Sequence, residues 1–522
     1  MPVISRNVAQ SPHVLSTAQF GVRADARSVE DAAITSGTAT LTSATASFGP
    51  GDVGKVVSVA GAGSAGATLA SSITAVVNAT TVTLAANAST TVSGKWMSYG
   101  TDDSDAITAW LTAVNSRGAG AVGYIHGLSM VTQGFVQNGG TRVYGAGWDY
   151  TSVAEPPQRG SGLIWAGSPT YGYQVGNLVA IEPGNTCPLL EDVAFFGYGL
   201  PTAVLKTHSA RTRCDRVQVF WGRTYGAYLF GQNTRLYDSV VGQNLNGHCV
   251  IVANSDVKIG RCEIRQGGDS QVYVLDSESL MLHDTHLFTG SFGSLSGVPS
   301  GCINLLVESG GASRSGILAV NNTFDGTTGP HIKIRMTSAH RYGWVTVTGN
   351  NFYQVGGFPG GQFAVMEFDG VASSTIREVN FTGNTIWNRD TTTYTYMLEN
   401  VGSATLAGIT ANSNAGGYFE ALANFVPTNS KENSWFDAAA NATRSSSPGG
   451  KQTFSGDGVT TAFTWSHLMG ATTPSRINIT PGSSAARGDF HVTATSTQIT
   501  VTYATAPASG TNNVVLYWEA GI

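Results

Sequence analysis

The stretch that opens with Asp192-Val193-Ala194-Phe195 repeats its pattern every 23 residues as far as Asp284. In each repeat a polar residue lies beside a short apolar run that is rich in β-branched residues, which favours strands over helices. A fixed period of about 20 to 50 residues is typical of a repeat architecture. We therefore expect a solenoid built from short strands. The polar positions that define the period are Asp192, Asp215, Asp238, Arg261 and Asp284.

The length of this repeat predicts a parallel β-helix. A coil of about 23 residues holds about three short strands and the turns between them. The pattern returns at wider intervals in Asn321-Asn322-Thr323-Phe324, Gly349-Asn350-Asn351-Phe352 and Gly383-Asn384-Thr385-Ile386, so we expect coils to about residue 420. Insertions in a solenoid often gather on its binding face. The longer coils after Asp284 are therefore the expected place of recognition.

The composition excludes several classes of protein. Charged residues make up 12% of the 522-residue chain, against about 25% in typical domains. Apolar residues make up 41%, which is too many for a disordered chain. The net charge is −5 and no basic stretch is present, so we expect no nucleic-acid partner. No apolar run is long enough to cross a bilayer, so we expect no membrane insertion.

An amphipathic helix is expected near residues 105–116. Ile107, Trp110, Leu111 and Val114 follow helical spacing, and acidic residues precede them, where they favour a helix N-terminus. A helix at this place would cover the first open coil of the solenoid and protect its strand edges.

Three segments resemble the N-terminal signature of the pectate-lyase-like superfamily. They are Phe20-Gly21-Val22, Thr101-Asp102-Asp103-Ser104-Asp105-Ala106-Ile107 and Thr141-Arg142-Val143-Tyr144-Gly145-Ala146-Gly147. That superfamily consists of right-handed parallel β-helices and includes many bacteriophage tailspikes. The resemblance covers about residues 18–150 and implies an all-β fold, a right-handed parallel β-helix with a short N-terminal capping helix. These motifs are signatures of the fold and identify no chemistry.

Alternating strand patterns on either side of the repeats indicate further domains. Residues 31–97, which split the signature, predict a small antiparallel β domain that either docks to a neighbouring protein or only decorates the surface. After a Ser-, Pro- and Gly-rich linker, the last strands predict a β-sandwich. It resembles C-terminal domains of phage tail fibres that hold three chains together. The expected segments are an attachment segment (1–17), the β-helix (18–30 and 98–445), the inserted domain (31–97) and a sandwich for trimerisation or receptor binding (446–522).

Glu367 and Asp369 are the preferred catalytic pair. Strand alternation places both on one outer face, about 7 Å apart along the strand, and the carboxylates of inverting glycosidases are about 6.5 to 9.5 Å apart. The alternative is a pair of solvated strand carboxylates. Glu263 is a second catalytic candidate, and its alternative is a surface ion pair with Arg265.

Aromatic side chains in neighbouring coils are candidates for stacking on sugar rings. Trp344, Phe352, Tyr353 and Trp387 form this set, and packing between coils is the alternative reading for them. Arg335 points outward from a nearby strand and is a further substrate-binding candidate. No spacing of His, Cys, Asp or Glu suits a metal, and no phosphate-cradling loop is present, so we expect neither a metal nor a cofactor.

The resemblance implies a tailspike or tail fibre that recognises bacterial surface polysaccharide, either capsule or O-antigen. It also implies a homotrimer in the virion tail that acts at the host cell surface, with its N-terminal region bound to a tail or baseplate protein. Depolymerisation by hydrolysis or elimination stays open beside a non-enzymatic structural or receptor-binding role. A secreted pectate-lyase-like polysaccharide lyase is a weaker alternative, because the N-terminal residues lack the pattern of a signal peptide.

Overall fold

In the computed structural model the chain forms two compact units, which are described separately. The first comprises Met1–Glu308 and Ile317–Gly329, and the second comprises Ser309–Gly316 and Pro330–Ile522. The structure describes residues 14–149, 156–176, 187–244, 247–288, 302–327, 329–354, 364–388, 394–416, 419–423, 436–438, 449–467 and 473–521. Residues 1–13 of the expected attachment segment and most of the expected linker lie outside these ranges.

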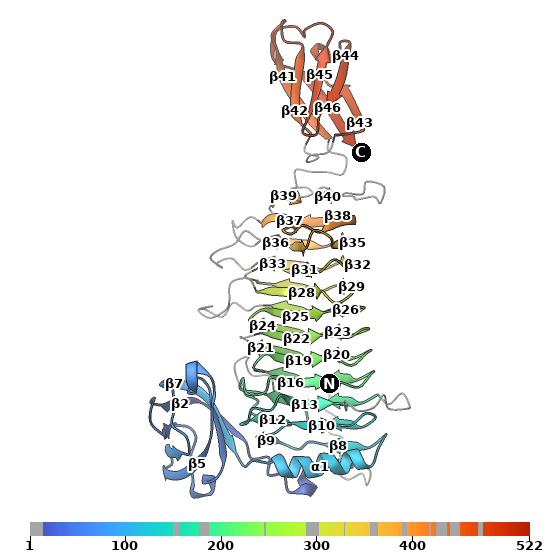
Figure 1. The fold of residues 1–522 in the computed structure, drawn as a ribbon. Helices are drawn as coiled ribbons and strands as arrows, with labels where there is room; N and C mark the ends of the chain where they lie inside the picture. The colour runs from blue at the N-terminus through green and yellow to red at the C-terminus, as the bar shows by residue number, and fades with distance from the viewer. Residues whose placement is uncertain are drawn as a thin grey trace, which may run out of the picture. The chain divides into compact units, whose positions relative to one another are not determined.

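The first unit is built from coils of three short strands (Figure 1). In one coil β17 (Arg213–Asp215), β18 (Gln218–Phe220) and β19 (Tyr225–Leu229) follow one another. Each pairs in parallel with its counterpart in the next coil. The parallel β-helix and the all-β fold class are therefore confirmed. The next strands are β20 (Arg235–Tyr237), β21 (Val240–Asn244), β22 (His248–Val252), β23 (Lys258–Gly260), β24 (Glu263–Gly267), β25 (Ser270–Leu275), β26 (Leu280–His283) and β27 (His286–Phe288).

The remaining coil strands repeat this arrangement at both ends of the series. Strands of the earlier coils are β8 (Val122–Tyr124), β9 (Leu128–Val131), β10 (Phe135–Gln137), β11 (Arg142–Tyr144), β12 (Gly162–Trp165), β13 (Tyr171–Val175), β14 (Leu189–Glu191), β15 (Ala194–Phe196) and β16 (Ala203–Thr207). Later strands are β28 (Ile303–Ser309), β29 (Arg314–Val320) and β30 (Thr323–Asp325). Ser309 of β28 and residues 314–316 of β29 belong to the second unit.

The repeated polar residue forms the corner between the first two strands of a coil. Asp192, Asp238, Arg261 and Asp284 have φ values of 57°, 51°, 52° and 50°, which is the left-handed region. In the coil that follows Asp192 and precedes Asp238, the corner residue is Arg216 (φ 51°). The expected mark Asp215 was therefore one residue early: it ends β17, is buried and is ion-paired with Arg213.

Ion pairs join corners of adjacent coils. The Arg216 guanidinium donates to both carboxylate oxygens of Asp192 at 2.6 and 2.8 Å. Arg261 donates to both oxygens of Asp238 at 2.7 Å. Bidentate arginine–carboxylate pairs have a well-defined geometry, so they favour one register between coils. This explains why acidic and basic residues share the corner position.

The helix α1 (Ser104–Ser116) covers one end of the first unit (Figure 1). Ile107, Trp110, Leu111 and Val114 are buried, as their spacing predicted. The Trp110 indole N–H donates to the carbonyl of Leu15 at 2.7 Å. A Cβ at Gly123 would lie 2.5 Å from the Trp110 ring, so this position requires glycine.

The first unit begins earlier than the sequence indicated. Strand β1 (Val14–Ser16) pairs in parallel with β8 and lies inside the segment 1–17 that we expected to be an attachment segment. It leads into the 3₁₀ helix η2 (Thr17–Phe20). The Asp103 carboxylate, which precedes α1, accepts hydrogen bonds from the backbone N–H groups of Arg23 and Ala24 at 2.8 and 2.9 Å.

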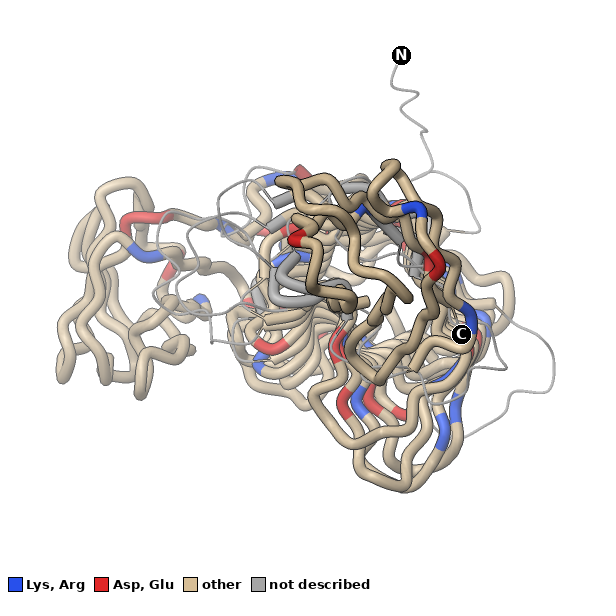
Figure 2. Tube along the Cα trace, turned by 90° about the horizontal axis from the view of Figure 1, so that it is seen from above, with Lys and Arg blue, Asp and Glu red and all other residues tan. Residues whose placement is uncertain are grey.

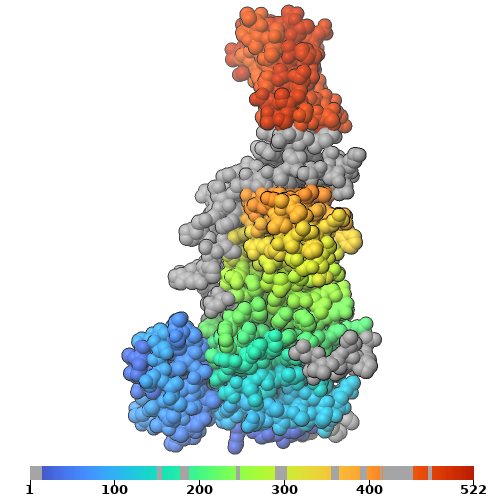
Figure 3. All heavy atoms as spheres, in the orientation of Figure 1, coloured from blue at the N-terminus to red at the C-terminus, as the bar shows by residue number. Residues whose placement is uncertain are grey.

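The inserted domain is a closed antiparallel barrel with its own apolar core. It packs on the coils through a buried cluster that includes Tyr198 and Phe196, and the surfaces of the two parts meet in Figure 3. Ser98 and the Tyr198 hydroxyl are 2.9 Å apart, and the Ser58 hydroxyl donates to the Trp165 carbonyl at 2.9 Å. The barrel contains β2 (Arg27–Ile34), β3 (Thr40–Thr42), η3 (Pro50–Asp52), β4 (Val56–Val59), η4 (Ser64–Gly66), β5 (Leu69–Asn78), β6 (Thr81–Leu84) and β7 (Val92–Gly100).

The second unit contains further coils. At their corners, asparagine side chains point inward and form hydrogen bonds between adjacent coils. The Asn350 N–H donates to Asn384 Oδ1, and the Asn384 N–H donates to Asn414 Oδ1, each at 3.0 Å. All three side chains are buried. The coil strands are β31 (Ile332–Met336), β32 (Arg341–Thr348), β33 (Asn351–Gln354), β34 (Met366–Gly370), β35 (Thr375–Thr382), β36 (Thr385–Asn388), β37 (Tyr394–Asn400), β38 (Thr405–Gly416), β39 (Phe419–Ala423) and β40 (Phe436–Ala438).

The last part of the chain forms a β-sandwich of two three-stranded antiparallel sheets. Trp465, Val501, Leu516 and Trp518 are among its buried core residues. The predicted C-terminal sandwich is thus confirmed. Its elements are β41 (Gly449–Gly456), β42 (Ala462–Ser466), β43 (Arg476–Pro481), η6 (Ser484–Ala486), β44 (Phe490–Ala494), β45 (Gln498–Tyr503) and β46 (Gly510–Gly521).

Charged residues are sparse along the chain trace, as the composition indicated (Figure 2). Among the described residues, no helix has the length and apolarity that crossing a membrane requires.

Candidate functional site

A cluster of five charged side chains lies on the outer face of three adjacent strands in the second unit. Strands β31, β34 and β37 run in parallel, and Lys333 pairs with Glu367, which pairs with Glu399. Arg335 pairs with Asp369 in the same register. Alternation produces this face, because the residues between them point into the core. Ile332, Ile334, Met366, Phe368 and Leu398 are those buried neighbours.

Lys333 bridges the two candidate catalytic carboxylates. Its Nζ lies 3.3 Å from Glu367 Oε2 and 3.1 Å from Asp369 Oδ2. Arg335 Nε lies 3.4 Å from the same Asp369 oxygen. Asp369 thus faces two cations, whereas Glu367 faces one and is the more deeply buried of the two, with 8% of its side chain exposed against 33%.

Burial raises the pKa of Glu367, and Lys333 offsets part of that effect because it favours the charged form. Burial and the nearby Glu367 also raise the pKa of Glu399. A carboxyl that keeps its proton at higher pH can act as a general acid. The arrangement therefore places Glu367, whose pKa is raised, beside Asp369, whose carboxylate lies close to two cations. Carboxyl groups in such different environments can take different roles in catalysis.

The structure brings three of the sequence-derived candidates together, namely Glu367, Asp369 and Arg335. Sequence reasoning did not assign Lys333 or Glu399 to the site. The signal that could have found them is the alternation itself. An outward residue follows an apolar one in Ile332-Lys333, Met366-Glu367 and Leu398-Glu399, one coil after another. Loops of different length separate these strands, so the spacing is not constant.

Tyr353 and Trp387 lie on a different sheet from the charged cluster. They pair across β33 and β36, their ring centroids are 5.6 Å apart, and 58% of Trp387 is exposed. Phe352 is completely buried, so the expectation that it joins an outer stacking platform is wrong. Its side chain alternates with that of Tyr353 and points into the core.

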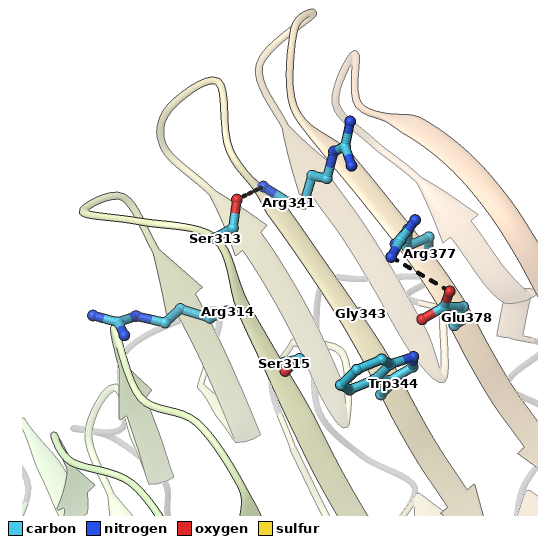
Figure 4. A pocket seen from close by; sticks show the side chains of 8 residues that line it. All are labelled: Ser313, Arg314, Ser315, Arg341, Gly343, Trp344, Arg377 and Glu378. Carbon is cyan, nitrogen blue, oxygen red and sulfur yellow. Dashed lines mark hydrogen bonds and ion pairs between the residues drawn. The ribbon is translucent and has the colours of Figure 1, made fainter.

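Trp344 lies on the third sheet, on β32, and lines a pocket of about 340 Å³ (Figure 4). It is 64% exposed. The four aromatic candidates therefore do not form one platform, because each corner of a coil turns the chain onto a new sheet. The pocket is lined by Ser313, Arg314, Ser315, Arg341, Gly343, Trp344, Arg377 and Glu378.

Glu263 lies in the first unit and belongs to a different setting. Its Oε1 is 2.8 Å from Nη1 of Arg265, whose side chain is buried. The Arg265 guanidinium also lies 5.9 Å from the ring centres of Phe220 and Phe288. The alternative for this residue was a surface ion pair with Arg265. The ion pair is present, but its arginine is buried. Within the described residues, no group of three or more His, Cys, Asp or Glu side chains could hold a metal ion.

The fold and the outward-facing site define a parallel β-helix protein with a polar surface cluster. Among solved structures, the chain is similar to the tailspike of Pseudomonas phage phi297, with 13% identity over 95% of this chain and 80% of that one (TM-score 0.37). It is similar to the Dettilon tailspike, with 12% identity over 80% and 91% (TM-score 0.40). A mannuronan C-5 epimerase A-module of Azotobacter vinelandii shares 13% identity over 63% and 93% (TM-score 0.34). The likeness concerns the fold alone. No protein-family model matches the chain, and no curated protein matches it.

Proposed function

We propose that this protein is a phage tailspike that binds a bacterial surface polysaccharide and hydrolyses it. The observation that carries the proposal is the raised pKa of Glu367, on the same outer face as the doubly ion-paired Asp369. A β-helix offers a long, stiff face on which a polymer can lie across several coils. The sparsely charged surface suits hydrogen bonding to sugar hydroxyls.

In the proposed reaction Glu367 donates its proton to the glycosidic oxygen as the bond to the anomeric carbon breaks. Asp369 accepts a proton from the water that attacks that carbon from the opposite side. The two residues are about 7 Å apart along the strand, which is within the range for an inverting hydrolase, although contact with Lys333 holds their nearest carboxylate oxygens closer together in this structure. Lys333 and Arg335 hold Asp369 in position. Activity should fall as pH rises through the raised pKa of Glu367, because the general acid is then ionised.

A second candidate is a tailspike that binds without cleaving, and the position of Lys333 favours it. Its Nζ lies within 3.3 Å of both carboxylates, in the space where an attacking water would sit. An ion-pair network can perturb a pKa without any catalytic role. The two candidates share their ligand and differ only in whether the polymer is cut.

The test is digestion of purified capsular and O-antigen polysaccharides from a panel of bacteria, followed by size-exclusion chromatography. Glu367→Gln should reduce depolymerisation by about 100- to 10,000-fold, the range for a general acid, while retardation in polysaccharide-containing native gels persists. Glu263→Gln is the matched control and should retain activity. If Glu367→Gln cleaves at the wild-type rate, the acid assignment is wrong. If wild type binds a polymer but shortens none, the binding-only candidate stands.

We also propose that three copies assemble, that the C-terminal sandwich contributes to assembly, and that the N-terminal region docks to a virion tail or baseplate protein. Closed cyclic symmetry is the usual form of homo-oligomers. Analytical ultracentrifugation should give three times the chain mass of 54.3 kDa. A chain that ends before Gly449 should dissociate more readily. A monomer at micromolar concentration would contradict the trimer.

A further inference from the structure

The pocket around Trp344 is separate from the charged cluster, because it lies on the outer face of β29, β32 and β35. Figure 4 shows Trp344 and Glu378 side by side on neighbouring strands, with Arg341 and Arg377 further along them. At about 340 Å³ the pocket reaches the size of small-molecule sites. All of its lining residues belong to the second unit.

The backbone at this pocket is strained where two side chains emerge. Trp344 and Glu378 have φ values of 53° and 54°, in the left-handed region. On other strands of the coils, glycines have positive φ values as well, namely Gly316 (92°) and Gly408 (61°). The ladder places Trp344 opposite Glu378, because their neighbours on both sides pair across β32 and β35. Glycine adopts this conformation without strain, whereas a bulky residue does not. Strain of this kind concentrates at functional sites.

The lining of the pocket contains more cationic than acidic side chains. Three arginines, Arg314, Arg341 and Arg377, line it together with one carboxylate, Glu378. Arg377 Nη2 lies 3.5 Å from Glu378 Oε1. In a chain whose net charge is −5, a cationic pocket is a local exception. Arginine pairs with carboxylates through two parallel hydrogen bonds, which suits recognition of an acidic group.

One acceptor in the pocket lacks a partner. Glu378 Oε2 is buried and forms no hydrogen bond with the described residues. It lies 3.5 Å from where a Cβ of Gly343 would be, so the missing side chain at Gly343 keeps space open beside it. A buried acceptor without a donor costs free energy, and a ligand hydroxyl would supply that donor.

We infer that this pocket is a non-catalytic binding site for an acidic sugar residue of a polysaccharide, such as a uronic acid. The exposed face of Trp344 stacks on the pyranose ring, Arg341 and Arg377 bind its carboxylate, and Glu378 Oε2 accepts a hydrogen bond from a ring hydroxyl. The inference rests on the proposed polysaccharide ligand but not on its cleavage. It narrows the ligand to an anionic glycan.

The test uses affinity electrophoresis in gels that contain acidic capsular polysaccharides from a panel of bacteria, each beside its carboxyl-reduced form. At least one acidic polymer should retard wild type, and its reduced, neutral form should not. Added NaCl should weaken retardation, since it screens arginine–carboxylate attraction. Trp344→Gly and Arg377→Gln should each weaken binding by about tenfold or more, as anchoring Trp and Arg residues do. Arg235→Gln removes an exposed arginine of the first unit and is the control.

Trp344→Gly separates binding from folding. Glycine relieves the left-handed strain at this position and the lost side chain is mostly exposed, so the Tm should equal or exceed that of wild type. Trp344→Phe should retain most of the binding. The inference is overturned if no acidic polymer binds, if reduced polymers or inorganic phosphate compete equally well, or if Trp344→Gly binds normally. Acidic polymers that bind here without being cut would overturn only the hydrolase proposal.

Discussion

At the scale of single residues, this protein uses charge in two different ways. At the corners of the first unit, exposed pairs such as Asp238–Arg261 join adjacent coils. On the outer face of β34, burial raises the pKa of Glu367 although Lys333 lies beside it and favours the charged form. The corner pairs are structural, whereas a buried carboxyl with a raised pKa is costly when ionised.

The first prediction concerns the free energy that Glu367 contributes at different pH values. Its pKa is raised above 4.5, so the folded state binds this proton more tightly than the unfolded state. That stabilisation is fully present below the unfolded pKa and is lost as pH rises through the folded pKa. Glu367→Gln should therefore have a higher Tm than wild type at pH 7 and nearly the same Tm at pH 4. An equal difference at both pH values would contradict the raised pKa.

The second prediction concerns the left-handed corner at Asp238 (φ 51°). Asp238→Val places a β-branched side chain in this conformation and should cost about 1 to 3 kcal/mol. Asp238→Asn keeps a residue that tolerates the conformation and loses only an exposed ion pair, which costs about 0 to 1 kcal/mol. Urea denaturation of the two variants measures the difference. Equal destabilisation would mean that the ion pair, rather than the backbone, matters here.

At the scale of elements, adjacent coils of the second unit are joined at their corners by a ladder of hydrogen bonds between buried asparagines. In the first unit, exposed ion pairs join the corners. Asn384 accepts the Asn350 N–H and donates from Nδ2 to the Val347 carbonyl at 3.0 Å. The side chain therefore satisfies backbone groups of the preceding coil. Buried backbone groups of a corner need such partners, because the turn interrupts the ladder between strands.

The third prediction follows from these bonds. Asn384→Ala removes the side-chain acceptor of the buried Asn350 N–H and one donor to the Val347 carbonyl. We expect a loss of about 1 to 3 kcal/mol in unfolding free energy, with faster hydrogen exchange at the Asn350 amide. Asn380→Ala, on an exposed position of β35, should change stability little. Unchanged protection at Asn350 would show that the ladder is dispensable.

At the scale of the whole molecule, the inserted barrel is part of the body of the first unit. Tyr198 is buried at their interface, and burial raises the pKa of its hydroxyl, which lies beside Ser98. Together with Phe196 and Met130 it belongs to an apolar cluster that includes barrel residue Ala60. An interface of this kind couples the stability of the two parts.

The fourth prediction is that Tyr198→Ala uncouples the barrel from the coils. Removing a large buried aromatic side chain costs about 3 to 5 kcal/mol. The barrel strands should then exchange their amide hydrogens faster than the coil strands, as mass spectrometry would detect. Tyr198→Phe loses only the contact with Ser98 and should cost about 1 kcal/mol. If Tyr198→Ala leaves exchange in β7 unchanged, other contacts hold the barrel.

The sequence by itself determined the elements of this protein, because those depend on local spacing. The 23-residue period predicts coils, the spacing of Ile107, Trp110 and Leu111 predicts the capping helix, and strand alternation places Glu367 and Asp369 on one face. Each of these signals lies within one coil or one strand, where periodicity alone decides which side chains point inward. The same reasoning predicted a small antiparallel β domain at residues 31–97 and the C-terminal sandwich, whereas the closure of the inserted domain into a barrel was seen only in the structure.

Only the tertiary structure decided which side chains meet across coils. Lys333 and Glu399 flank Glu367 although 34 and 32 residues separate them from it in the chain. Loops of unequal length set that register, and no local pattern encodes it. Trp344, Tyr353 and Glu367 lie on three different sheets, because the chain passes from one sheet of the β-helix to the next at each corner. The sequence pattern placed one corner at Asp215, whereas the structure has it at Arg216. A shift of one residue moves every following side chain of the strand to the opposite face, and only the parallel pairing between coils determines where the corner lies.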